Sequence, residues 1–300
     1  MLARLLRRIY FFQLLSGGLL GFYAADRLTL GGTAAMAAVL LGALLLPLLL
    51  QLCMISVIMI QSRPKSAGPL WWRAFGGDFL AALRIFWFQL PWAAASTTVS
   101  YPDTPRQTQP WRVPVLLVHG YICNYRVWDK MARALQQAGH PVLAITLEPL
   151  FSSIDDYAPQ IQQAVRQLQQ ASGATQVALV GHSMGGLAIR AWIRRHGSAD
   201  VANFITLGTP HQGTQMPNWS PTTNSAQMAW HSPWLKALQA SETVATRQLM
   251  HIILTRHDNI VYPQREQVLA DAGVTEFSGL GHLELCLDQG VIDFLLKKLR

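Results

Sequence analysis

A serine flanked by glycines stands at position 183, in the motif GHSMG at residues 181–185. The apolar run QVALV (176–180) before it is typical of a buried strand, and a helix-like segment follows from residue 185. Glycines two residues to either side permit a sharp strand-to-helix turn that lifts the serine oxygen out of the sheet edge. The helix that follows would point its free amides at a developing oxyanion. The motif therefore predicts that Ser183 is a nucleophile.

A serine hydroxyl attacks well only when a base takes its proton and an acid orients that base. Among the histidines after Ser183, His282 lies in the loop SGLGHL (278–283), which follows the last predicted strand and precedes a C-terminal amphipathic helix. Loops of this kind commonly present functional residues. We predict His282 as the base, with His257 and His211 as the alternatives.

The order serine, acid, histidine along the chain places the acid between these two residues. Asp258 comes directly after the apolar run HIILT (251–255), in the loop at the C-terminal end of a predicted strand. The rivals are Asp271, expected in a helix, and Glu276, expected inside the last strand. Neither is expected on a suitable loop, so Asp258 is the predicted acid.

Acyl chemistry also needs two amide donors for the oxyanion of the tetrahedral intermediate. One is the amide of Met184, which follows the nucleophile. The second is expected from Tyr121, which follows the strand-ending pair His119-Gly120 one strand–helix unit upstream. His119 itself is expected to orient this loop rather than to transfer a proton.

Short β-rich runs alternate with helix-period segments from Trp111 to the C-terminus. The predicted strands are 113–118, 141–147, 176–180, 203–207, 251–255 and 274–277, and the helical segments include 125–138, 156–171 and 185–196. Such alternation predicts an α/β fold, with a mostly parallel sheet and helices on both faces. Ligands in these sheets bind beyond the C-terminal ends of the strands, where the predicted nucleophile and acid lie.

The N-terminal third has a different character. Residues 33–60 contain no charged residue, and about 20 apolar residues suffice to cross a bilayer. The shorter uncharged stretch 9–25 follows Arg4, Arg7 and Arg8. We predict a transmembrane helical hairpin with spans at about 9–25 and 33–60. The alternative is that 9–25 belongs to a signal peptide.

Basic residues flank both ends of this predicted hairpin, with Arg63, Lys65 and Arg73 after the second span and one arginine in the turn. The positive-inside rule then places both ends, and the rest of the chain, in the cytoplasm. We expect a multi-pass protein of a bacterial inner membrane, with a cytoplasmic catalytic domain. A single span would place that domain on the opposite side.

Four tryptophans and scattered arginines occur in residues 71–92, a composition that suits the membrane–water interface. Packing against the catalytic domain is the alternative. A polar, proline-bearing linker follows at 93–110. The predicted organisation is a membrane hairpin at 1–70, an interfacial helix and linker at 71–110, and a catalytic domain at 111–300.

Hydrophobic residues make up 51% of the chain and charged residues 13%, about half the charged share of a typical soluble protein. The net charge of +8 indicates an anionic partner, and basic residues beside apolar stretches favour lipid headgroups over nucleic acid. The three cysteines show neither zinc spacing nor a disulfide framework. We expect no cofactor and no metal.

With these motifs in hand, the chain resembles bacterial lipases and esterases of the α/β-hydrolase superfamily. The likeness covers about residues 112–300 and rests on HG (119–120), GHSMGG (181–186) and LGTPHQGT (207–214). It implies an α/β-hydrolase fold, a Ser183–Asp258–His282 triad, and hydrolysis of lipid or apolar esters through an acyl-enzyme. Acyl transfer and thioester hydrolysis use the same triad and remain alternatives, as does a noncatalytic membrane scaffold. Residues 216–234 are expected to form either an acyl-binding wall or ordinary packing.

Overall fold

The computed structural model describes the chain except for residues 65–67, 95–96, 104–110 and 217–221. Its C-terminal part is built on a six-stranded sheet in the order β2-β1-β3-β4-β5-β6, in which every neighbouring pair is parallel. The strands are β1 (Val115–Val118), β2 (Val142–Ile145), β3 (Val177–His182), β4 (Val201–Leu207), β5 (Met250–Thr255) and β6 (Gly273–Phe277). The predicted α/β class and parallel sheet are confirmed, and each predicted strand is present.

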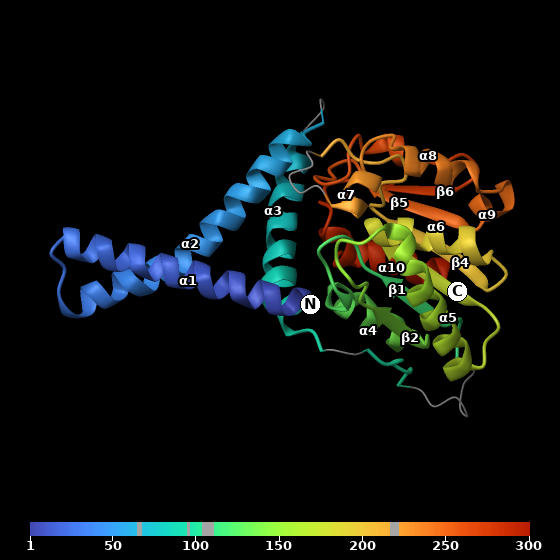
Figure 1. The fold of residues 1–300 in the computed structure, drawn as a ribbon, viewed down its shortest axis with the longest axis horizontal. Coiled ribbons are helices and arrows are strands. Elements are labelled where there is room, and N and C mark those ends of the chain that lie inside the picture. The colour runs from blue at the N-terminus through green and yellow to red at the C-terminus, as the bar shows by residue number, and fades with distance from the viewer. Residues whose placement is uncertain (65–67, 95–96, 104–110, 217–221) are drawn as a thin grey trace.

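Helices cover both faces of this sheet (Figure 1). The longer ones are α4 (Asp129–Gln137), α5 (Ala158–Ser172), α6 (Met184–His196) and α10 (Gln289–Lys298). Side chains alternate along the strands, so Leu116 joins the core under α5 and α6 while Leu117 joins the core under α4 and α10. Burial on both faces explains why β1 is apolar throughout, whereas the edge strand β6 is largely exposed and carries Thr275 and Glu276.

Shorter helices fill the connections. They are η3 (Tyr125–Trp128), η4 (Ile154–Tyr157), α7 (Thr223–Gln227), α8 (Pro233–Ala240), α9 (Val244–Gln248), η5 (Arg265–Gln267) and η6 (Glu284–Cys286). Asp271, which was expected in a helix, instead lies in a turn with φ 70°. Aspartate tolerates this left-handed conformation better than most residues do.

Two long helices, α1 (Leu2–Arg27) and α2 (Gly32–Gln61), pack against each other and extend away from the sheet domain (Figure 1). Glycines make their close crossing possible. A Cβ built on Gly42 would overlap the carbonyl oxygen of Gly17, and one on Gly21 would overlap that of Ala38. Small residues at four-residue spacing are a common way for membrane helices to approach closely.

By length and hydropathy, α2 is the one candidate membrane span among the described residues, and 22% of its most apolar window is buried. Helix α1 does not meet the same test. Its outward-facing side chains are nevertheless apolar, with Phe11, Phe12, Leu19 and Phe22 all more than half exposed. The two-helix hairpin is therefore present as a structural unit, whereas two membrane spans remain a prediction.

Helix α3 (Pro69–Leu83) stands between the hairpin and the sheet domain (Figure 1) and continues through the π-helical η1 (Arg84–Gln89) into η2 (Leu90–Trp92). One side of this continuous helix is buried at Asp78, Ile85 and Leu90. The other side exposes Trp72 and Phe88. The helix thus packs on the sheet domain, as the alternative interpretation proposed, and still presents aromatic side chains outward.

Candidate active site

The turn that carries Ser183 is a strained elbow between β3 and α6. Ser183 has φ 54° and ψ −127°, a backbone conformation that non-glycine residues rarely adopt. A Cβ on Gly181 would lie 2.6 Å from the amide nitrogen of Gly186, and one on Gly185 would overlap the carbonyl oxygen of Val118. Both glycines of the motif are therefore required by close backbone approach.

Two loops meet at this elbow, as an oxyanion site requires. A Cβ on Gly120 would lie 2.7 Å from the Cβ of Ser183, so the loop after β1 runs directly against the predicted nucleophile. Tyr121 is the next residue of that loop. Met184 is the first residue of α6, where backbone amides have no carbonyl partner within the helix. The two predicted donors thus belong to segments that flank Ser183.

The predicted base and acid are hydrogen-bonded to each other. Nδ1 of His282 lies 2.8 Å from Oδ2 of Asp258, and both side chains are almost fully buried. The other oxygen, Oδ1 of Asp258, accepts hydrogen bonds from the amides of Ile260 (2.9 Å) and Val261 (2.7 Å). The carboxylate is held by three donors, so its orientation toward the imidazole is fixed.

Position 208 ties this pair to the nucleophile elbow. A Cβ on Gly208 would lie 3.0 Å from Oδ2 of Asp258 and 3.1 Å from Nδ1 of His282. The amide of Ser183 donates to the carbonyl of Leu207, the residue before Gly208 (2.9 Å). Gly208 also has φ 54°. The motif LGTPHQGT therefore supplies a glycine that the acid and base pack against.

The pKa values of the two histidines at the site, His282 and His182, are shifted in opposite directions. Burial by itself lowers the pKa of His282, but the carboxylates of Asp258 and Asp78 outweigh burial and raise its pKa above the usual value. Burial, followed by the charge of His282, holds the pKa of His182 well below its usual range. Nε2 of His182 lies 3.1 Å from the carbonyl oxygen of His282, so the residue next to the nucleophile contacts the base loop.

The other histidines considered for catalysis have structural contacts. Nδ1 of His119 lies 2.7 Å from the carbonyl oxygen of Gly120, and its Nε2 accepts from the amide of Leu147 (2.8 Å). His211 is buried between Arg190 and Thr206. His257 accepts the amide of Gly279 through Nδ1 (3.0 Å). Each of these rings is thus engaged in contacts that fix its own segment, and His119 and His257 bond loop backbone directly.

The alternative acids lie away from this pair. Glu276 on β6 forms ion pairs with Arg256 and Arg265, and Asp271 is exposed in its turn. Among the residues that the structure describes, no group of three or more His, Cys, Asp or Glu side chains is arranged to hold a metal ion.

The segment expected as an acyl wall or as packing is partly described. Met228 is buried in the core beside α6, and Trp234 donates to Oδ2 of Asp155 (2.8 Å) and packs against the same core. Trp219 lies outside the described residues. Ordinary packing accounts for Met228 and Trp234.

Three residues at the site were not found from the sequence. Asp78 from α3 reaches the base loop, Asn259 bonds the backbone of His282, and Gln264 bonds the carbonyl of Asp258. One signal could have indicated Asp78, because it is the only acidic residue between Asp26 and Asp103. A lone carboxylate in so apolar a stretch needs buried partners.

Comparison with solved structures identifies the fold. The chain is similar to Bacillus licheniformis lipase BlEst2 in mature form, with a TM-score of 0.57 and 19% identity, over 68% of this chain and 99% of that one. It is also similar to Aspergillus fumigatus lipase B, with a TM-score of 0.54 and 16% identity, over 67% of this chain and 56% of that one. The fold is that of the lipase and esterase α/β-hydrolases.

The family model described as palmitoyl protein thioesterase matches residues 114–268. Because this match takes in just over half of the sequence, the chain belongs to that family.

Curated relatives match more locally. A triacylglycerol lipase from Burkholderia plantarii is 34% identical over 137 residues, which are 42% of this chain and 36% of the relative. The lysosomal thioesterase PPT2-B from Xenopus laevis is 27% identical over 106 residues, 33% of this chain and 36% of the relative. The chain thus spans little more than a third of the length of these relatives.

Proposed function

We propose that this protein is a serine hydrolase that cleaves apolar carboxylic esters through an acyl-enzyme on Ser183. The observation that carries the proposal is the buried His282–Asp258 pair, bonded at 2.8 Å, beside a serine held at a strained elbow. A noncatalytic scaffold would have no need for this strain, since backbone strain persists where function requires it. The family and the lipase relatives support the same activity.

The chemistry follows from the placement of these groups. His282, with Nδ1 hydrogen-bonded to Asp258, has Nε2 available to take the Ser183 proton as Oγ forms a bond to the ester carbonyl carbon. The resulting oxyanion is stabilised by the amides of Tyr121 and Met184. Collapse breaks the bond to the leaving alkoxide, which takes the proton from His282. Water then repeats the sequence and releases the carboxylic acid and free Ser183.

Thioester hydrolysis is the second candidate, and the match to the palmitoyl protein thioesterase model favours it specifically. The acyl-enzyme and its triad would be the same, and the leaving group would be a thiolate instead of an alkoxide. Transfer of the acyl group to an acceptor other than water shares the same first half-reaction.

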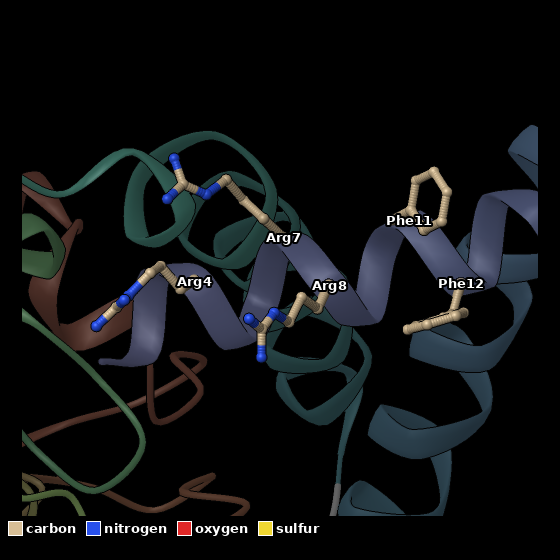
Figure 2. Close-up of a pocket in the computed structure, with 5 residues that line it drawn as sticks. All are labelled: Arg4, Arg7, Arg8, Phe11 and Phe12. Carbon is tan, nitrogen blue, oxygen red and sulfur yellow. The ribbon is translucent and has the colours of Figure 1, made fainter.

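We further propose that the α1–α2 hairpin lies in the membrane with both of its ends on the cytoplasmic side. The outward surface of both helices is apolar. Arg4, Arg7 and Arg8 project from the first turns of α1, next to the sheet domain, and Phe11 and Phe12 follow further along the helix (Figure 2). This order of exposed arginines followed by exposed aromatics suits a helix that passes from anionic headgroups into hydrocarbon.

The test of the activity uses the full chain in detergent. Hydrolysis of p-nitrophenyl esters from acetate to palmitate, and thiol release from palmitoyl-coenzyme A, are measured for the wild type, Ser183→Ala and the matched control Ser198→Ala. We expect activity in the wild type and the control, greater on long than on short acyl chains, and none in Ser183→Ala. A folded wild type with no Ser183-dependent turnover of either series would refute the proposal. Faster thioester than ester turnover would select the second candidate.

The membrane arrangement is tested separately with a reporter fused after Arg300. Alkaline phosphatase activity of this fusion in a bacterial host would contradict the two-span arrangement, because that enzyme is active outside the cytoplasm. Fluorescence of a cytoplasmic reporter is the expected result.

A further inference from the structure

We propose that Asp78 of α3 is a positioning residue for the predicted base, and that the N-terminal helices thereby complete the active site. This inference rests on the function proposed above. It concerns a part of the chain outside residues 114–268, the region that the family model matches.

Asp78 is 1% exposed and reaches the base loop from a helix more than 200 positions earlier in the sequence. Its Oδ1 accepts from the amides of Leu283 (2.8 Å) and Glu284 (3.1 Å), the two residues directly after His282. A Cβ built on Gly281 would overlap the Asp78 side chain. Asp78 therefore packs against the residue before the base and bonds the two residues after it.

The second oxygen of this carboxylate extends the contact to the base itself. Oδ2 of Asp78 accepts from Nδ2 of Asn259 (2.9 Å), and Oδ1 of Asn259 accepts from the backbone amide of His282 (3.1 Å). Asn259 is 2% exposed and directly follows Asp258, the predicted acid. One buried chain of hydrogen bonds thus runs from α3 through the acid loop to the base.

The acid loop has its own connection to the N-terminal helices. Nε2 of Gln264 donates to the carbonyl of Asp258 (2.8 Å) and to the carbonyl of Ser62 (3.1 Å). Ser62 is the C-cap residue of α2. Nη1 of Arg73 on α3 also donates to the carbonyl of Ser278 in the base loop (3.4 Å). The loops that carry both Asp258 and His282 are therefore braced by α2 and α3.

The direction of each hydrogen bond between Asp78, Asn259 and His282 allows a specific test. Asn259 must present its NH₂ to Asp78 and its oxygen to His282, because the carboxylate only accepts and the amide only donates. In Asp78→Asn, the oxygen of the new amide would stay on the two loop amides and its NH₂ would face the NH₂ of Asn259. Flipping Asn259 would move the donor clash to the amide of His282. Either orientation of Asn259 therefore loses one hydrogen bond of this network.

The double variant, with Asp78→Asn and Asn259→Asp in the same protein, restores every one of these hydrogen bonds. The asparagine at 78 donates to the new carboxylate at 259, which still accepts from the amide of His282. Asn259→Asp alone would place two buried carboxylates against each other, which is unfavourable. The single variants should therefore fail and the double variant should recover.

The experiment measures kcat, KM and the pH profile of ester hydrolysis for the wild type, both single variants, the double variant and the surface control Asp293→Asn. We expect kcat of each single variant to fall about 10- to 100-fold with little change in KM, the usual range for losing a group that orients a catalytic residue. The double variant should lie within about fivefold of the wild type, and the control should match the wild type.

The pH profile separates positioning from a purely structural role. The charged groups facing His282 are Asp258 from the acid loop and Asp78 from α3, with His182 packed against its ring. Removing the Asp78 charge should move the acid limb of kcat/KM to lower pH, and the double variant should move it back. Hydrogen exchange of residues 281–284 in the Ser183→Ala background should be faster in Asp78→Asn, independently of turnover.

Several outcomes would overturn the proposal. These are an Asp78→Asn variant with wild-type kcat per folded molecule, unchanged protection of residues 281–284, or a double variant no better folded or more active than the single ones. If Asp78→Asn is too unstable to purify, the double variant still decides, because it must fold and turn over. Absence of Ser183-dependent turnover in the wild type would instead refute the proposed function. The exchange measurement would still test whether Asp78 holds the base loop in place.

Discussion

Asp258→Asn is expected to lower kcat about 10⁴-fold while leaving the fold intact. The size of the effect follows from which end of the new amide can face the base. Oδ1 of Asp258 accepts from two backbone amides, of Ile260 and Val261. Placing the NH₂ there would leave both donors unpaired, at a cost of about 1–3 kcal/mol each. The amide oxygen therefore stays at that position and the NH₂ faces His282.

An NH₂ group opposite Nδ1 of His282 makes Nδ1 an acceptor, so the proton moves to Nε2. In that tautomer Nε2 cannot take the proton of Ser183. The same substitution in a well-characterised triad lowers kcat by about 10⁴ with the geometry intact, which is about 5 kcal/mol of transition-state stabilisation.

The assay is ester hydrolysis and the rate of fluorophosphonate labelling, with thermal unfolding as the check on folding. Asp271→Asn is the matched control, because Asp271 is exposed in a turn of the same part of the chain. An Asp258→Asn variant within tenfold of wild-type kcat would refute the assignment of the acid. Equal losses in the two variants would also refute it.

Two further predictions concern stability. Arg190→Met should destabilise the protein by about 3 kcal/mol in denaturant unfolding, because it strips the buried Glu242 carboxylate of its bidentate partner and leaves only the longer contact to Arg247; a change under 1 kcal/mol would contradict this. Burial, aided by the charge of Asp78, raises the pKa of Glu284 to about 7, so ionisation opposes folding and stability is lost as pH rises from about 4.5 to about 7. Glu284→Gln should thus unfold at a higher temperature than the wild type at pH 8 and not at pH 5, and the opposite order would contradict the burial argument.

The elements of the sheet domain could be predicted because their signals are local. The apolar run before Ser183 and the flanking glycines depend on neighbours within a few residues, and the structure shows the same strand, elbow and helix. The loop positions of Asp258 and His282 followed from strand ends in the same way. Their hydrogen bond is a tertiary contact that the fold class implied.

The contribution of α3 could not be predicted because it depends on contacts far apart in sequence. Nothing near Asp78 indicates that its partners are at residues 259, 283 and 284. Composition predicted that this helix lies at a membrane interface, and that position remains a prediction; Trp72 and Phe88 are exposed. Its buried face became visible only in the packed structure.

The central claim is that Ser183 forms the covalent acyl-enzyme. The most direct measurement is mass spectrometry of the purified full chain after reaction with a fluorophosphonate, with peptide mapping of the adduct. We predict one adduct, on the peptide containing Ser183, and none in Ser183→Ala of equal thermal stability. A folded wild-type protein that remains unmodified, or that carries the adduct at another residue in both forms, would contradict the account.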